Sequence, residues 1–159
     1  MKAPIQIDQE CFATQLFALL DETFENHHGM FLDKGTSLFE TLKTITAAQA
    51  SCPIGEGRAS LAAHVAHVTF YLDVLERYIL ARLTDDVDWK DIWLHVKEVT
   101  PEEWADLKYE LERTYRRVVS TLRGLPAWDG ENAIGGALAI VVHTAYHLGA
   151  IRQAPCVVK

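Results

Sequence analysis

Apolar residues recur along most of the chain at intervals of three or four positions, the spacing that predicts amphipathic helices. Five segments carry this pattern, four long and one short: about 8–26, 60–83, 101–123 and 132–153, with the short one at about 37–49. No segment shows the strict alternation of a half-buried strand. We therefore predict an all-α fold, a four-helix bundle with one short extra helix, formed by a single domain over residues 1–159.

Capping residues and helix breakers set the expected ends of these helices. Ser37-x-x-Glu40 has the form of a capping box at the start of the short helix. Thr100, with Pro101 at the first helical position and Glu103 as the box partner, gives the clearest helix start in the chain. Pro and Gly predict a loop at 51–57, and an acidic, Trp-bearing stretch predicts another at 84–100.

The last predicted helix contains a run, 133–151, that lacks Asp, Glu, Lys and Arg. Its length is close to the roughly 20 residues that span a bilayer. However, His143 and His147 lie in its C-terminal half, and ionisable side chains are costly inside a membrane. We therefore predict a core helix of a protein that does not enter a membrane. Being apolar all round, it is expected to be the most enclosed helix of the bundle.

Net charge and cysteine content restrict the possible binding partners and the expected cellular compartment. The formal net charge is −7, which disfavours binding to nucleic acid. The densest basic cluster is interleaved with Glu110 and Glu112, so it forms no basic patch; it consists of Arg113, Arg116, Arg117 and Arg123. Cys11, Cys52 and Cys156 are scattered, odd in number and free of CxxC spacing. This pattern predicts reduced thiols in a cytoplasmic protein rather than a disulfide framework.

Four of the seven histidines form two pairs with helical spacing. His64 and His67 lie three residues apart in one predicted helix, and His143 and His147 lie four apart in another. Each pair shares one helix face, so both rings of a pair can reach one metal ion. A third histidine from the facing helix would complete an open, catalytic type of site. The alternative is that these are core histidines bonded to backbone carbonyls and water.

The sequence lacks the motifs of zincin peptidases, di-iron proteins and phosphate-binding loops. Thr144 follows His143 where a zincin peptidase needs glutamate. Only Glu25-x-x-His28 has the spacing of a di-iron motif, and it falls at a helix end. Gly135 and Gly136 lack the lysine and the preceding strand of a phosphate-binding loop, so close helix packing explains them better.

Two longer motifs resemble the DinB-like family of bacterial four-helix bundles, which includes metal-dependent enzymes. SLAAHVAHVTFYL at 60–72 is similar to that family's second-helix pattern, and HTAYHLGAIRQ at 143–153 is similar to its last helix. The first motif selects His67, with His64 as an additional histidine one turn earlier. The second motif selects His143 and His147. TSLFETLKTITAAQAS at 36–51 is also similar to the stretch before the first ligand in these proteins.

This resemblance implies that His67, His143 and His147 bind a divalent metal at one end of the bundle, with zinc or nickel as the expected ion. It implies a hydrolase or a thiol-dependent transferase acting on a small molecule, with bacillithiol, mycothiol or glutathione as the thiols that relatives use. It also implies a homodimer. His64 would then lie beside the ligands or transfer a proton.

No catalytic residue beyond the metal ligands is assigned. Tyr71 is a candidate to line the pocket, Arg152 is a candidate anion contact, and His95 could overhang the cleft. Trp89 and Trp93 are expected to anchor their loop onto the bundle or a partner. The competing hypothesis is a non-enzymatic helical stress or interaction protein with structural histidines. A third is a pH sensor built on His64 and His67. His27 and His28 are expected at the surface.

Overall fold

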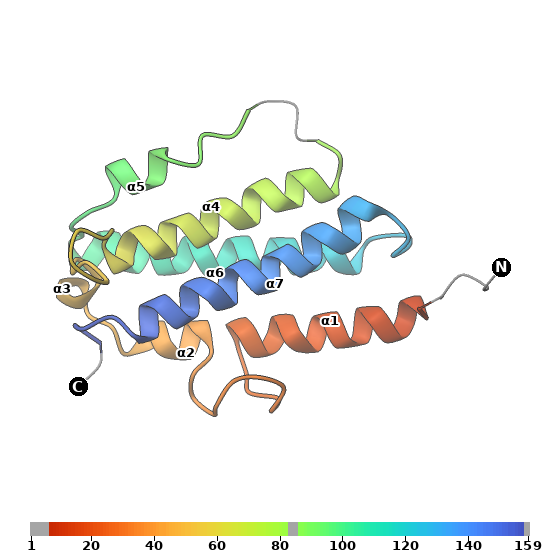
Figure 1. Ribbon diagram of the computed structural model, residues 1–159, viewed down its shortest axis with the longest axis horizontal. Coiled ribbons are helices and arrows are strands. Elements are labelled where there is room, and N and C mark those ends of the chain that lie inside the picture. The colour runs from red at the N-terminus through yellow and green to blue at the C-terminus, as the bar shows by residue number, and fades with distance from the viewer. Residues whose placement is uncertain (1–6, 83–85, 158–159) are drawn as a thin grey trace.

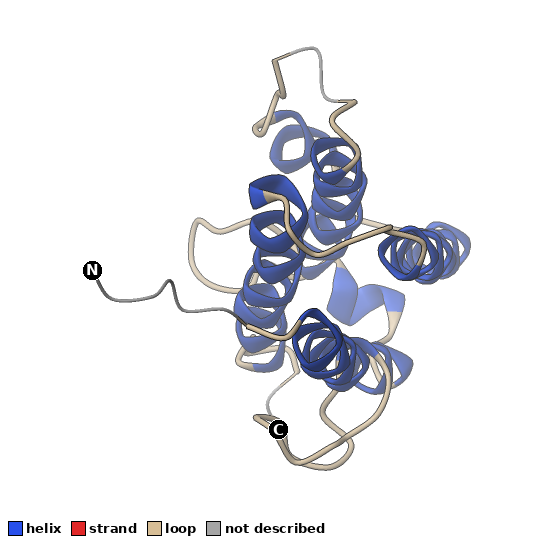
Figure 2. Cartoon of the chain, turned by 90° about the vertical axis from the view of Figure 1, so that its right-hand side faces the viewer, coloured by secondary structure: helices blue, strands red, loops and turns tan. Residues whose placement is uncertain are grey.

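Four long helices dominate the computed structural model, which describes residues 7–82 and 86–157 (Figure 1). They are α1 (Gln9–Phe24), α4 (Leu61–Ile79), α6 (Pro101–Arg123) and α7 (Glu131–Arg152). Viewed from the end in Figure 2, the described residues form helices and loops. One isolated antiparallel bridge joins Pro53 and Ser60. The predicted all-α four-helix bundle is confirmed.

Three short helices lie between the long ones, and here the prediction was too coarse. The expected single helix at 37–49 is divided into α2 (Leu38–Lys43) and α3 (Ala47–Ala50). The break follows because Thr46 forms a second capping box, with Gln49, directly after the first helix ends. The predicted loop before α6 contains α5 (Asp91–His95). The expected end of the helix at Leu83 lies outside the described residues; α4 ends at Ile79.

Helix α4 lies at the centre of the bundle and packs on both α6 and α7, while α1 packs on α7. Residues 86–100, which lead into α6, run back along the outside of the bundle (Figure 1). Consequently α4 and α6 point in the same direction, whereas α7 runs opposite to α4. The core between the helices is filled by large aliphatic and aromatic side chains, with Phe24 stacked on Tyr115 at a centroid distance of 4.2 Å.

Gly136 allows α7 to approach α4 closely. A Cβ atom added at this position would lie 2.5 Å from Cγ1 of Ile79, well inside van der Waals contact. The neighbouring Gly135 is exposed, and an added Cβ there meets nothing within 4 Å. The prediction that these glycines serve close packing therefore holds for Gly136 alone.

The prediction that α7 is the most enclosed helix is wrong. Nine of its 22 residues are buried, against 13 of 19 in α4. Leu138, Val142 and Tyr146 follow one another at four-residue intervals and face outward, with Tyr146 72% exposed. By length and composition α7 meets the criteria for a membrane span, and 44% of its most apolar window is buried inside the bundle.

Candidate metal centre

Both histidine pairs lie where α4 and α7 pack against each other. Ser60 caps α4 by accepting a hydrogen bond from the backbone N–H of Ala63, at 3.2 Å. The first two turns after this cap carry His64 and His67, which are both buried. Because α7 runs opposite to α4, its C-terminal half, with His143 and His147, lies beside these turns.

Three imidazoles from the two helices converge. One nitrogen from each of His67, His143 and His147 lies within 4.8 Å of the other two. The ring centroid of His67 lies 5.1 Å from that of His143 and 5.0 Å from that of His147. Nitrogens bound at about 2.0–2.1 Å to one tetrahedral ion lie about 3.4 Å apart, so the three rings must close by up to about 1.4 Å to complete such a site.

Two nitrogens of this triad are buried without a hydrogen-bond partner among the described residues. They are Nδ1 of His67 and Nε2 of His143. An unpaired polar atom inside a protein costs free energy, which a metal ion would remove by taking the nitrogen lone pair. The three neutral nitrogen donors suit a divalent ion of the zinc or nickel type. The triad predicted from the sequence therefore fits a metal.

His64 contacts the triad from the side. Its Nδ1 lies 2.8 Å from Nδ1 of His147, so one of these nitrogens donates a hydrogen bond to the other. If Nε2 of His147 binds a metal, its Nδ1 carries the hydrogen and donates to His64. In that case His64 would fix the tautomer and orientation of a ligand ring, the role expected of a histidine beside the ligands.

Two aromatic rings enclose the triad. Tyr71 stacks face to face on His143, with centroids 3.5 Å apart and planes at 7°. Trp93 of α5 lies over His67 at 4.3 Å. Tyr71 therefore packs on a candidate ligand ring, rather than lining the large pocket described below. Trp93 anchors its segment, as predicted, and does so directly on the histidines.

Burial keeps these four histidines neutral. It lowers the pKa of His64 and of His143 to about 4, with a further contribution from His67 in each case. Burial and the three neighbouring histidines lower the pKa of His147 to about 3. Burial also lowers the pKa of His67. Neutral imidazole is the form that binds metal, so the site is prepared for an ion at neutral pH.

The lowered pKa values predict that acid destabilises the metal-free protein. Unfolded histidines titrate near pH 6.5, whereas these four stay neutral in the fold to a lower pH. The unfolded state therefore binds more protons between about pH 6.5 and 4, so the free energy of unfolding falls as the pH falls through this window. Urea denaturation in chelator at pH 7.5 and 5.5 measures this; equal midpoints would contradict it.

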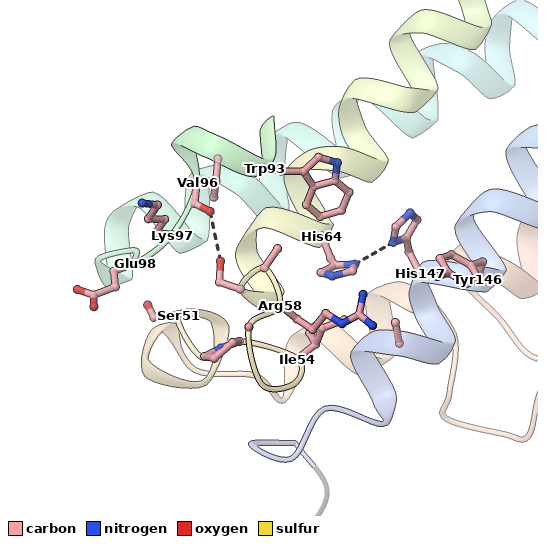
Figure 3. Close-up of a pocket in the computed structure, with 15 residues that line it drawn as sticks. Ser51, Ile54, Arg58, His64, Trp93, Val96, Lys97, Glu98, Tyr146 and His147 are labelled. Atoms are coloured by element: carbon pink, nitrogen blue, oxygen red, sulfur yellow. Dashed lines mark hydrogen bonds between the residues drawn. The ribbon is translucent and has the colours of Figure 1, made fainter. Parts of the chain in front are cut away.

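A pocket of about 850 Å³ opens beside the triad (Figure 3). His64, His147 and Trp93 lie at its inner side, and Arg58 extends into it from the loop before α4. Tyr146 of α7 adds a second aromatic wall. A volume of this size suits a small organic molecule. The charged lining residues are Arg58, Lys97 and Glu98, so the pocket carries a net positive charge in an acidic protein.

Several sequence candidates lie elsewhere. Arg152 donates to the hydroxyl of Thr41 at 3.2 Å and does not line this pocket. His95 borders a separate groove beside α6 rather than overhanging the histidines. Trp89 packs on Phe70 and Tyr71 at the other side of the triad. His27 and His28 are exposed, as predicted.

Arg58 is the functional candidate that the sequence analysis missed. It stands in a glycine-rich loop, where no helical period assigns a side chain to a face. The sequence feature that could have identified Arg58 is its position two residues before Ser60, the N-cap of the helix that carries His64 and His67. A charge so placed lies near the first turn of that helix.

Comparison with known protein families gives one match, to the DinB superfamily over residues 32–151. No curated protein and no solved structure matches the sequence significantly. The matched region includes α2 to α7 almost to its end, and with them all four clustered histidines. The bundle, the two histidine motifs and this match agree, and the chain belongs to the DinB superfamily.

Proposed function

We propose that the protein is a metal-dependent enzyme that acts on a small molecule, as a hydrolase or a thiol-dependent transferase. The observation that carries the proposal is the convergence of His67, His143 and His147, two of them with unpartnered buried nitrogens, beside a pocket of about 850 Å³. A divalent ion with an open position lowers the pKa of a bound water or thiol and polarises a substrate oxygen.

The residues around the triad have separable roles in this proposal. His64 orients His147 and holds a proton on the pocket side. Trp93 and Tyr146 supply apolar walls for the body of the substrate. Arg58 and Lys97 favour a substrate that carries a carboxylate or another anionic group, because guanidinium and ammonium groups donate charge-assisted hydrogen bonds to such oxygens.

The proposal also includes the expected homodimer and a cytoplasmic location. The outward stripe of Leu138, Val142 and Tyr146 on α7 offers an apolar face for a second copy. Sedimentation that shows only monomer at micromolar concentration would contradict the dimer. The cytoplasmic location rests on three cysteines that are all free thiols in the structure.

Cobalt substitution tests the metal and the thiol together. The protein loaded with Co²⁺ is titrated with glutathione, a thiol with two carboxylates, and separately with S-methylglutathione as the control. We expect a cobalt–sulfur charge-transfer band with glutathione alone. Arg58→Gln is expected to weaken the apparent affinity about tenfold, the loss of one charged hydrogen bond of about 1.5 kcal/mol.

The outcomes separate the hypotheses. Cobalt binding without a response to glutathione would contradict glutathione as the thiol and favour the hydrolase. If no cobalt binds, the metal-dependent proposal fails and the non-enzymatic helical protein with structural histidines is favoured.

A further inference from the structure

Two cysteines from distant parts of the chain meet at one backbone carbonyl. Cys52 lies in the loop after α3, and Cys156 lies in the segment after α7. The carbonyl oxygen of Gln49 accepts the N–H of Cys52 at 3.1 Å and the thiol of Cys156 at 3.5 Å. The Gln49 side-chain amide in turn donates to the carbonyl of Cys156 at 2.9 Å, a contact between residues 107 positions apart.

These contacts hold the two thiols next to each other. The thiol of Cys52 donates to the carbonyl of Ala48 at 3.3 Å, and the thiol of Cys156 donates to the next carbonyl along the chain, that of Gln49, at 3.5 Å. Both residues are partly exposed, so small oxidants can reach them. Ala154, two residues before Cys156, is fully buried, which fixes the start of the segment that carries Cys156. A disulfide needs sulfurs about 2.05 Å apart, so both thiols must leave these carbonyls and turn toward each other when the bridge forms.

We propose that Cys52 and Cys156 form an oxidation site that closes to an intramolecular disulfide on reaction with a peroxide. The thiolate of Cys52 attacks one peroxide oxygen, the O–O bond breaks, and Cys52 becomes a sulfenic acid while water or an alcohol leaves. The sulfur of Cys156 then attacks the sulfenic sulfur, the S–S bond forms and water leaves. Two thiols lose two electrons and two protons, and the peroxide is reduced by two electrons.

The order of these steps follows from the surroundings of Cys156. Burial and the neighbouring Cys52 raise the pKa of the Cys156 thiol, which disfavours its thiolate. Since the thiolate is the nucleophile, Cys52 reacts first and Cys156 resolves the sulfenic acid. This step uses neither the histidines nor a metal, so it stands independently of the proposed enzymatic function.

The bridge would act on the pocket through its wall. Ser51 and Pro53, on either side of Cys52, both line the pocket. Cys156 follows α7, which carries His143 and His147. A covalent link therefore ties the loop that leads to Arg58 to the end of the helix with two candidate ligands.

The test treats the full-length, metal-free protein with one equivalent of hydrogen peroxide, alkylates the remaining thiols under denaturing conditions, and measures the intact mass and the peptide map. We expect loss of two hydrogens, one alkylated thiol at Cys11 and a peptide joining Cys52 to Cys156. Cys11→Ser is the matched control and should keep the bridge, whereas Cys52→Ser and Cys156→Ser should lose it.

Three alkylated thiols in treated wild-type protein would overturn the proposal. So would sulfinic acid at Cys52 without a bridge, or a dimer linked through Cys11. Because the wild-type peptide map alone decides these outcomes, the proposal stays testable even if a serine variant folds poorly.

Discussion

Replacing His67 with alanine is expected to abolish stoichiometric binding of zinc or nickel. His67 is the single contribution of α4 to the triad, and without it two adjacent ligands on α7 remain. Wild-type protein, freed of any affinity tag and dialysed against the ion, should hold about one equivalent by mass spectrometry of the metal, as one three-histidine site requires. His143→Ala should lose the ion likewise. When the ion is present at 100 times its Kd, it should raise the free energy of unfolding of wild type by about 2.7 kcal/mol and leave that of the variants unchanged.

Two further variants calibrate this result. His64→Ala leaves the triad in place and removes the hydrogen bond to His147, so we expect the affinity to fall about 10- to 100-fold rather than to vanish. His27→Ala changes an exposed histidine that belongs neither to the triad nor to the pocket lining, and it should match wild type. Equal, sub-stoichiometric metal in wild type and His67→Ala would show that the triad holds no ion.

Gly136→Ala is expected to destabilise the fold, while Gly135→Ala stabilises it. The new methyl group at position 136 would lie 2.5 Å from Cγ1 of Ile79, a β-branched core residue with little rotamer freedom. Overpacking of this kind costs about 1–3 kcal/mol, which outweighs the gain of about 1 kcal/mol from alanine in a helix. At position 135 only that gain applies, because the added methyl meets nothing within 4 Å.

Thermal and urea denaturation of the two variants measure this difference. For a chain of this size, 1 kcal/mol shifts Tm by about 2–4 °C, so the pair should fall on opposite sides of wild type. The two sites are neighbours in the middle of one helix, so the contribution of helix propensity is matched. Equal stability of both variants would contradict the close approach of α7 to α4.

Local signals in the sequence located most of the fold. Helical periodicity found the four long helices, and the Thr100, Pro101 and Glu103 pattern located the start of α6 because capping is a short-range hydrogen-bond requirement. The division into α2 and α3 was missed because apolar residues continue across the break. Only the second capping box, at Thr46, marks it.

Tertiary relations were less accessible from sequence. Apolar composition placed α7 in the core, yet it does not specify which face a neighbour covers, and the stripe at Val142 and Tyr146 is exposed. Helical spacing paired the histidines, but their convergence depends on the antiparallel packing of α4 and α7. The approach of Cys52 to Cys156 follows from the path of the chain ends, which no local period encodes.

The contact between Trp93 and His67 gives the site an optical signal of its own. The indole lies 4.3 Å from the imidazole centroid and also forms part of the pocket wall. Indole fluorescence responds to charge and to heavy ions within contact distance, so an ion or ligand arriving here changes the emission of this tryptophan. Subtracting the spectrum of Trp93→Phe removes the emission of the other three tryptophans. Occupancy of the site can thus be followed in real time, without a label and before any substrate is identified.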